Sequence, residues 1–307
     1  MKIIKEELFF IKETLRYGYG LSGVLKYLVN KFWNSRAIFK LKLPDYKLID
    51  GVEIHILCQK KDSIMLAWSL VSFIKQTGIC LKIIIHDYCS FYKKTAKRLE
   101  SKFPELKVLF LTEANMLINN MTNLTPKLLE HRKFGHKLIY KLVDIFLLSR
   151  TEKVMVLDSD VLFFNRPEEI LKFINENPDC DSLISRHDGS CDLMLLPDYS
   201  TKHDILKNEA GYMNSGIIFY KKDKIGDDKL LEYFENTLRE PGDYFVEMTG
   251  WASLIAQTKF KFLTKERYVV KGRPETNTVA KHFTSPRRHE FYIYGIDMVR
   301  KGILEHE

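Results

Sequence analysis

The chain of 307 residues has only five cysteines, and no two of them are close enough to form a Cys-x-x-Cys pair. A cysteine-based zinc site or a thiol redox motif would need such a pair, so neither is expected. The odd number and wide spacing indicate reduced thiols, as in a cytosolic protein. They are Cys58, Cys80, Cys89, Cys180 and Cys191.

Long apolar runs are also missing. No stretch reaches the ~18 uninterrupted apolar residues of a membrane-spanning helix. The N-terminus lacks the apolar core and small-residue cleavage site of a secretory signal, so we expect a cytoplasmic protein. With 15 glycines and 9 prolines, the chain has too few of either for a collagenous or disordered protein. Its 45% hydrophobic content instead predicts a packed core.

Acidic residues are outnumbered, at 40 against 48 lysines and arginines, which gives a net charge of +8. Such an excess favours a polyanionic partner, and phosphates, nucleic acid and anionic lipid all fit. Two segments carry the excess: residues 1–43 hold nine basic and three acidic residues, and residues 265–288 hold seven and two. The remainder of the chain is slightly acidic, so the charge is local.

The first segment, residues 1–45, interleaves basic with large apolar side chains at helical spacing. This pattern predicts one or two amphipathic helices, which either pack on the protein's own core or lie on the inner face of a membrane through residues 1–43. Gly18, Gly20 and Gly23 have the spacing of a dinucleotide-binding loop, but they follow a helical pattern rather than a strand. We expect the catalytic domain to span residues 46–307.

From residue 46 the pattern alternates between strand and helix. A turn signal at Asp50 and Gly51 precedes a predicted strand, and the helix that follows is expected to end at Gly78. This order predicts an α/β fold with mostly parallel strands covered by helices on both faces. The predicted strands are 52–58, 81–85, 107–111 and 153–157, and the predicted helices are 64–74, 91–103 and 136–149.

The segment Val154–Phe164 is apolar on both sides of two acids, Asp158 and Asp160. Read as one buried strand, it places both carboxylates on the same side. Two ionised carboxylates in an apolar setting need a compensating cation, and hard oxygen ligands suit Mg²⁺ or Mn²⁺. Asp179 and Asp181 have the same spacing but follow a proline instead of an apolar strand, so we interpret them as a loop.

Val154–Phe164 resembles the D-x-D segment of nucleotide-sugar-dependent glycosyltransferases of the GT-A fold, especially glycosyltransferase family 8 and its relatives. Three further segments resemble family motifs in the same order: Tyr212–Phe219, Glu247–Ala252 and Lys281–Phe283. The match spans roughly residues 52–290. One departure is Met248, where relatives often have Gln.

The resemblance implies roles for particular residues. Asp158, Asp160 and His282 would bind the metal, and a histidine ligand favours Mn²⁺ over Mg²⁺. Asn214 and its neighbours Ser215 and Gly216 would bind the donor sugar, and Glu247 would lie near the acceptor. Further donor-binding candidates are Asp87, Lys137, Lys141, Ser159 and Lys281, with Lys60, Asp62, Arg273 and Arg287 as weaker candidates.

The resemblance implies a metal-dependent glycosyltransferase that moves a sugar from a nucleotide diphosphate donor, most simply UDP-linked, to a hydroxyl on a glycan, lipid-linked or protein acceptor. Cell-surface polysaccharide synthesis is one setting. Family 8 implies retention at the anomeric carbon, whereas inversion would need a carboxylate base such as Glu247 or Asp243. The alternatives are a sugar nucleotidyltransferase and a non-enzymatic basic protein that binds membranes or nucleic acid; the transferase needs no nucleic acid.

Overall fold

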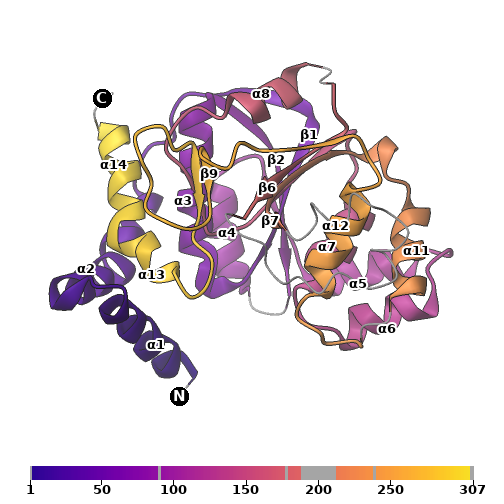
Figure 1. Cartoon of the computed structure of the whole chain (residues 1–307), viewed down its shortest axis with the longest axis horizontal. Coiled ribbons are helices and arrows are strands. Elements are labelled where there is room, and N and C mark those ends of the chain that lie inside the picture. Colours follow the sequence, from indigo (N-terminus) through magenta and orange to yellow (C-terminus); the bar gives the residue numbers. More distant parts are fainter. Residues whose placement is uncertain (1, 89–90, 177–178, 188–211, 238–239, 305–307) are drawn as a thin grey trace.

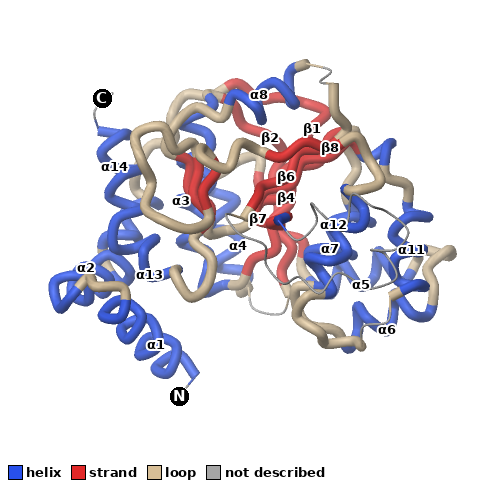
Figure 2. The backbone as a smooth tube through the Cα atoms, in the orientation of Figure 1, coloured by secondary structure: helices blue, strands red, loops and turns tan. Residues whose placement is uncertain are grey.

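The computed structural model describes residues 2–88, 91–176, 179–187, 212–237 and 240–304. Its centre is a seven-stranded sheet in the order β3-β2-β1-β4-β7-β6-β8, drawn in red in Figure 2. β7 runs antiparallel to both neighbours, and the other paired strands of this sheet are parallel. The strands are β1 (Lys47–Cys58), β2 (Ile79–Asp87), β3 (Leu106–Leu109), β4 (Lys153–Leu157), β6 (Ser182–Arg186), β7 (Met213–Lys221) and β8 (Phe260–Phe262).

Helices cover both faces of this sheet, and each face has its own hydrophobic core (Figure 1). One face is covered by α3 (Ser63–Thr77), α4 (Lys93–Lys102), α8 (Glu168–Asn175) and α14 (Ile296–Leu304). The other is covered by α5 (Leu111–Asn119), α6 (Pro126–Phe134), α7 (Ile139–Leu148), α11 (Asp227–Asn236) and α12 (Val246–Ile255). The predicted α/β fold class and mostly parallel sheet are confirmed.

Local sequence signals explain several element ends. Gly78 ends α3 in the left-handed conformation with φ of +67°, as predicted, because a residue without Cβ adopts it at little cost. Thr125 caps α6 by accepting from the backbone N–H of Leu128. The predicted turn at Asp50 and Gly51 is wrong: β1 continues through it, and the residues form an irregularity in the pairing with β2.

The prediction of one strand through Val154–Phe164 is also wrong. β4 ends at Leu157, the next three residues form a turn, and the chain enters β5 (Val161–Phe163). β5 belongs to a second sheet with β10 (Ala280–His282) and β9 (Tyr268–Val269). The two aspartates therefore lie at the crossing between two sheets.

The N-terminal segment forms α1 (Lys2–Arg16), α2 (Gly20–Phe32) and the 3₁₀ helix η1 (Asn34–Phe39). These pack beside α13 (Arg288–Glu290), the π-helical turn η5 (Phe291–Gly295) and α14. Phe10, Tyr27 and Ile38 join the core of that face, so one side of the amphipathic pattern does pack on the protein itself. The boundary at residue 46 stays a prediction. Short 3₁₀ turns are η2 (Lys60–Asp62) and η4 (Lys222–Lys224).

The described residues include three of the five cysteines and the helices named above. Cys58, Cys80 and Cys180 are free thiols, while Cys89 and Cys191 lie outside the described residues. None of the described helices has the length and apolar character that crossing a bilayer requires.

We predict that Gly250→Val destabilises the fold by about 2–3 kcal/mol, because overpacking a filled core forces neighbours out of place. A Cβ at Gly250 would lie 2.2 Å from Leu142 Cδ2 and 3.0 Å from Tyr233 Cε1, where α12 packs on α7 and α11. Urea unfolding measures the loss. Gly302→Val on α14 is the matched control, since a Cβ there meets nothing within 4 Å; equal stability of both variants would contradict the packing argument.

Candidate active site

Three chain segments meet at one edge of the main sheet. Asp158 follows the end of β4, and because β7 runs antiparallel to β4, its first residues, including Asn214, reach the same edge. His282 is the last residue of β10, where it pairs with Val161 at the start of β5. The fold thereby brings His282 next to Asp158 and Asn214, although Asn214, the nearer of the two in sequence, precedes it by 68 positions.

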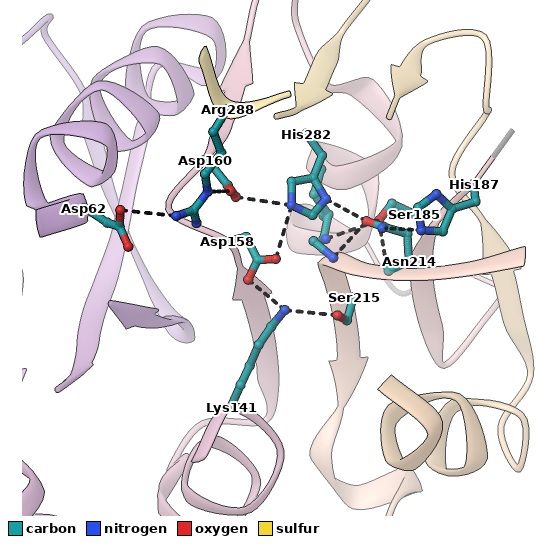
Figure 3. Close-up of polar contacts among 12 residues, drawn as sticks. Asp62, Lys141, Asp158, Asp160, Ser185, His187, Asn214, Ser215, His282 and Arg288 are labelled. Atoms are coloured by element: carbon teal, nitrogen blue, oxygen red, sulfur yellow. Dashed lines mark hydrogen bonds and ion pairs between the residues drawn. The ribbon is translucent and has the colours of Figure 1, made fainter. Parts of the chain in front are cut away.

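The side chains of Asp158, Asp160 and His282 converge as the sequence predicts (Figure 3). His282 Nε2 lies 3.3 Å from an oxygen of Asp158 and 3.2 Å from an oxygen of Asp160. The three potential ligand atoms all lie within 4.8 Å of one another, close enough to share one metal ion. Among the described parts of the chain this is the one such group of acids, histidines and cysteines.

Asn214 fixes the ring of His282. Its side-chain oxygen accepts from the backbone N–H of Gly216 at 3.0 Å and lies 2.8 Å from His282 Nδ1. Nδ1–H is therefore the donor, which leaves Nε2 facing the two carboxylates. Once Nε2 gives up its proton, its lone pair fits a metal ion, and oxygen, oxygen and imidazole nitrogen form a donor set suited to Mn²⁺.

The charges around His282 explain the pKa values of the group. Burial alone would lower the pKa of His282, but Asp160 and Asp158 outweigh it and raise the pKa to about 9. Burial likewise would raise the pKa of Asp160, whereas Arg288 and His282 hold it well below its usual range. The two carboxylates are thus ionised, as metal ligands must be.

Gly216 is needed for the packing of His282. A Cβ at this position would lie 2.2 Å from Nδ1 and 2.6 Å from Cε1 of the imidazole. We expected Gly216 to let the backbone approach a donor, but the space a side chain would take is filled by His282, and Gly216 does not line the cleft described below.

Lys141, near the start of α7, joins the turn to α12. Its ammonium lies 2.7 Å from Asp158 Oδ1 and 3.5 Å from Glu247 Oε1, and it donates to Ser215 Oγ at 3.1 Å. Burial would lower the pKa of Lys141, but Asp158 and Glu247 outweigh it and raise the pKa. Lys141 is therefore a buried cation held by two carboxylates.

Arg288 balances the negative charge on the opposite side of the turn. Its Nε donates to Asp160 Oδ2 at 2.7 Å, and NH1 lies 3.3 Å from Asp62 Oδ1 (Figure 3). With the carboxylates of Asp158 and Glu247, four acidic groups face the two cations Lys141 and Arg288. Burial raises the pKa values of Asp62 and Glu247, whereas neighbouring cations hold those of Asp158 and Asp160 below their usual range. The negative charge is therefore concentrated on Asp158 and Asp160, where a divalent ion would balance it.

These side chains line a cleft of about 520 Å³, a size suited to a small-molecule ligand. Lys137 and Ser159, two predicted donor-binding residues, also line it. Lys137 lies in the turn before α7 rather than inside the helix, so it does not share a helix face with Lys141. A larger open hollow of about 770 Å³ between residues 39–46 and α4 lies away from the carboxylates, and we favour the cleft because it holds the clustered charges.

Besides Gly216, two predicted donor-binding residues do not line the cleft. Asp87 accepts from the backbone N–H of Phe91 and so stabilises its own loop. Lys281 alternates with His282 along β10 and points the other way, where its ammonium donates to the carbonyls of Val270 and Gly272. This placement does not support a donor contact by either residue.

The basic segment 265–288 contributes one cation to the cleft, and it is Arg288 rather than Arg273 or Arg287. Arg287 pairs with Glu290, and Arg273 lies over the ring of Tyr294. Arg288 entered the prediction only as one of the seven basic residues of this segment, because the residue pattern gives no way to distinguish it from Arg287.

His187 is a second cleft residue that we did not predict. Its Nε2 accepts from the side-chain amide of Asn214 at 3.0 Å, so all the polar atoms of that amide have partners inside the protein. Asn214 thus positions His282 and also lines the cleft, and the donor-sugar contact that the resemblance implied for it stays a prediction.

No protein-family model and no curated protein matches the sequence. Among solved structures, the WbbM bifunctional glycosyltransferase in its apo form is 12% identical, covers 82% of this chain and 51% of its own, and has a TM-score of 0.53. Mouse xyloside xylosyltransferase 1 is 12% identical over 80% of this chain and 99% of its own, with a TM-score of 0.49.

The galactosyltransferase LgtC, solved with donor and acceptor sugar analogues, is similar at 12% identity over 81% of this chain and 94% of its own, with a TM-score of 0.49. The chain has the GT-A glycosyltransferase fold, as the D-x-D segment predicted. Membership of family 8 in particular stays a prediction.

We predict that Gly216→Ala weakens Mn²⁺ binding about tenfold, because residues that orient a ligand typically carry such an effect. The added methyl would displace the imidazole of His282 from the carboxylates. Titration followed by electron paramagnetic resonance measures the affinity, with Gly302→Ala as the control. Unchanged affinity in a folded Gly216→Ala protein would contradict the assignment of His282.

Proposed function

We propose that this chain is a metal-dependent glycosyltransferase that transfers a sugar from a nucleotide diphosphate donor, UDP-linked in our assignment, to a hydroxyl acceptor. The observation that carries the proposal is the convergence of Asp158, Asp160 and His282 in a cleft at the sheet edge of a GT-A fold. Ligands of open α/β sheets bind at this edge.

Asp158, Asp160 and His282 would hold Mn²⁺, with Mg²⁺ as the alternative ion. A bound divalent ion supplies charge to the leaving diphosphate, which is Lewis-acid chemistry. Around it, Asn214 fixes the imidazole and Lys141 holds Asp158 on the side away from Arg288. Lys141 thus keeps the carboxylate oriented, and this rigidity suits a site that must stabilise charge.

Arg288 would bind the diphosphate directly. It lines the cleft, lies against Asp160 and is partly exposed, so its remaining N–H groups can reach a ligand. A planar guanidinium donates to phosphate oxygens in pairs. Lys137, exposed at the same cleft, would add a second positive charge near the donor.

We assign a retaining outcome. Inversion would need a carboxylate base beneath the acceptor. Of the two candidates, Glu247 lines the cleft but lies against the ammonium of Lys141 and accepts from Ser215, and Asp243 accepts from the backbone N–H of Phe245. In the retaining reaction the leaving phosphate itself assists deprotonation of the acceptor. The acceptor would be a glycan, lipid-linked or protein hydroxyl, in cell-surface polysaccharide synthesis among other settings.

We predict that UDP with Mn²⁺ raises the melting temperature of the protein by several degrees and that Asp160→Asn abolishes the shift. Asp179→Asn is the matched control: it has the same D-x-D spacing but is exposed in a loop, where it pairs with Lys259, so it should keep the full shift. Loss of the shift in both variants, or a full shift in Asp160→Asn, would refute the site.

Arg288→Gln should lower kcat/KM for hydrolysis of the preferred donor about 100-fold, since a charge that stabilises the leaving group is commonly worth this much. UDP-, GDP- and CMP-sugars are screened with Mn²⁺ to find that donor. Arg273→Gln, outside the cleft, serves as the comparison and should stay within about twofold of the parent protein. Equal effects of the two substitutions would remove Arg288 from the reaction.

A further inference from the structure

Large apolar side chains are exposed on the N-terminal helices far more than elsewhere. Of the sixteen large hydrophobic residues that the described chain exposes, nine belong to α1, α2 and the residues that join or follow them. They are Leu8, Phe9, Leu15, Tyr17, Leu21, Leu25, Val29, Phe32 and Trp33. Such a concentration marks an interaction surface, whereas scattered apolar residues do not.

These residues form a regular stripe on α2. Leu21, Leu25 and Val29 are spaced by four and are followed by Phe32, so they share one face of the helix. The opposite face, with Gly23, Tyr27 and Asn30, is buried. Asn30 also donates to the backbone carbonyl of Tyr292 at 2.6 Å, which anchors α2. The helix is therefore fixed to the protein by one side and presents a second apolar side outward.

The exposed charges of the same chain segment have one sign. Between residues 5 and 42 every exposed charged side chain is basic. They are Lys5, Lys12, Arg16, Lys26, Arg36, Lys40 and Lys42. The acids of this stretch are paired or buried: Glu7 pairs with Lys31, Glu6 pairs with Lys61, and Glu13 is buried. Lys26 in turn pairs with Asp297 of α14. We call these basic and apolar residues the N-terminal surface.

We propose that the N-terminal surface docks on an anionic phospholipid membrane. Apolar side chains would enter the boundary between headgroups and acyl chains, and the lysines would lie against the headgroup charge. A second copy of the chain fits less well, because two like-charged surfaces would repel. This surface is independent of the transferase activity proposed above.

The surface lies close to the cleft. A cavity of about 110 Å³ beneath α1 and α2 is lined by Asp62 and Arg288, both of which also line the cleft. In Figure 1, α1 and α2 lie together beside α13, at one end of the molecule. Docking through them would hold the catalytic edge of the sheet near the membrane.

The chain carries its own spectroscopic probe for this proposal. Its three tryptophans are Trp33, which is 67% exposed, and Trp68 and Trp251, which are fully buried. Transfer of Trp33 into the interfacial region should shift its emission to the blue when vesicles of phosphatidylcholine with 30% phosphatidylglycerol are added. Trp33→Phe should remove the shift without removing the signal of the buried pair.

The test compares the full chain with three double variants in vesicle cosedimentation. Leu21→Glu with Leu25→Glu should weaken binding at least about tenfold, because each change removes apolar burial and adds repulsion from the lipid. Met116→Glu with Leu117→Glu, at exposed apolar positions of α5, is the matched control and should bind as the parent does. Lys5→Gln with Lys12→Gln should weaken binding to the anionic vesicles about tenfold.

Several results would overturn the proposal. One is equal vesicle binding by the Leu21→Glu/Leu25→Glu and Met116→Glu/Leu117→Glu variants. Another is equal binding of the parent protein to vesicles of pure phosphatidylcholine, which would show that anionic lipid is not needed. A parent protein that dimerises in sedimentation, ignores vesicles and becomes monomeric with Leu21→Glu and Leu25→Glu would show a second copy as the occupant. Asp160→Asn should keep vesicle binding, so failure of the membrane proposal is distinguishable from failure of the proposed reaction.

Discussion

The architecture of the cleft depends on the repulsion between two carboxylates held at one turn. Asp158 and Asp160 lie around a single imidazole nitrogen of His282, in a setting where uncompensated charge is costly. Each aspartate has a separate cationic partner, Lys141 for one and Arg288 for the other. The two partners come from opposite sides of the turn, so the central space between the carboxylates and His282 is left for an ion.

This arrangement requires parts of the fold that look unrelated in sequence. β7 must run antiparallel so that Asn214 reaches the end of β4, and Gly216 must lack a side chain so that the imidazole fits beside it. α12 must pack closely on α7, where Gly250 contacts Leu142, because these helices carry Glu247 and Lys141. The packing of these elements therefore determines whether the charged side chains of the cleft can reach their partners.

Much of the fold could be predicted from the sequence, because helices, strands and their ends depend on residues that are close together in the chain. The alternation of strand and helix and the end of α3 at Gly78 are encoded in short patterns. The partnership of Asp158 and Asp160 with the distant His282 was implied by the family resemblance. What could not be predicted depends on direction in three dimensions. Lys281 and His282 are adjacent, but strand alternation sends only one of them into the cleft. Arg287 and Arg288 are likewise adjacent at the start of α13, yet Arg287 pairs with Glu290 and Arg288 with Asp160.

The most direct measurement is a crystal structure of the full chain with Mn²⁺ and UDP, with anomalous diffraction recorded at the manganese edge. The account predicts one strong anomalous peak bonded to Asp158, Asp160 and His282 Nε2, with the diphosphate on the side of Arg288. A peak bound by other residues, or UDP bound in the cleft with no metal between these three side chains, would contradict it.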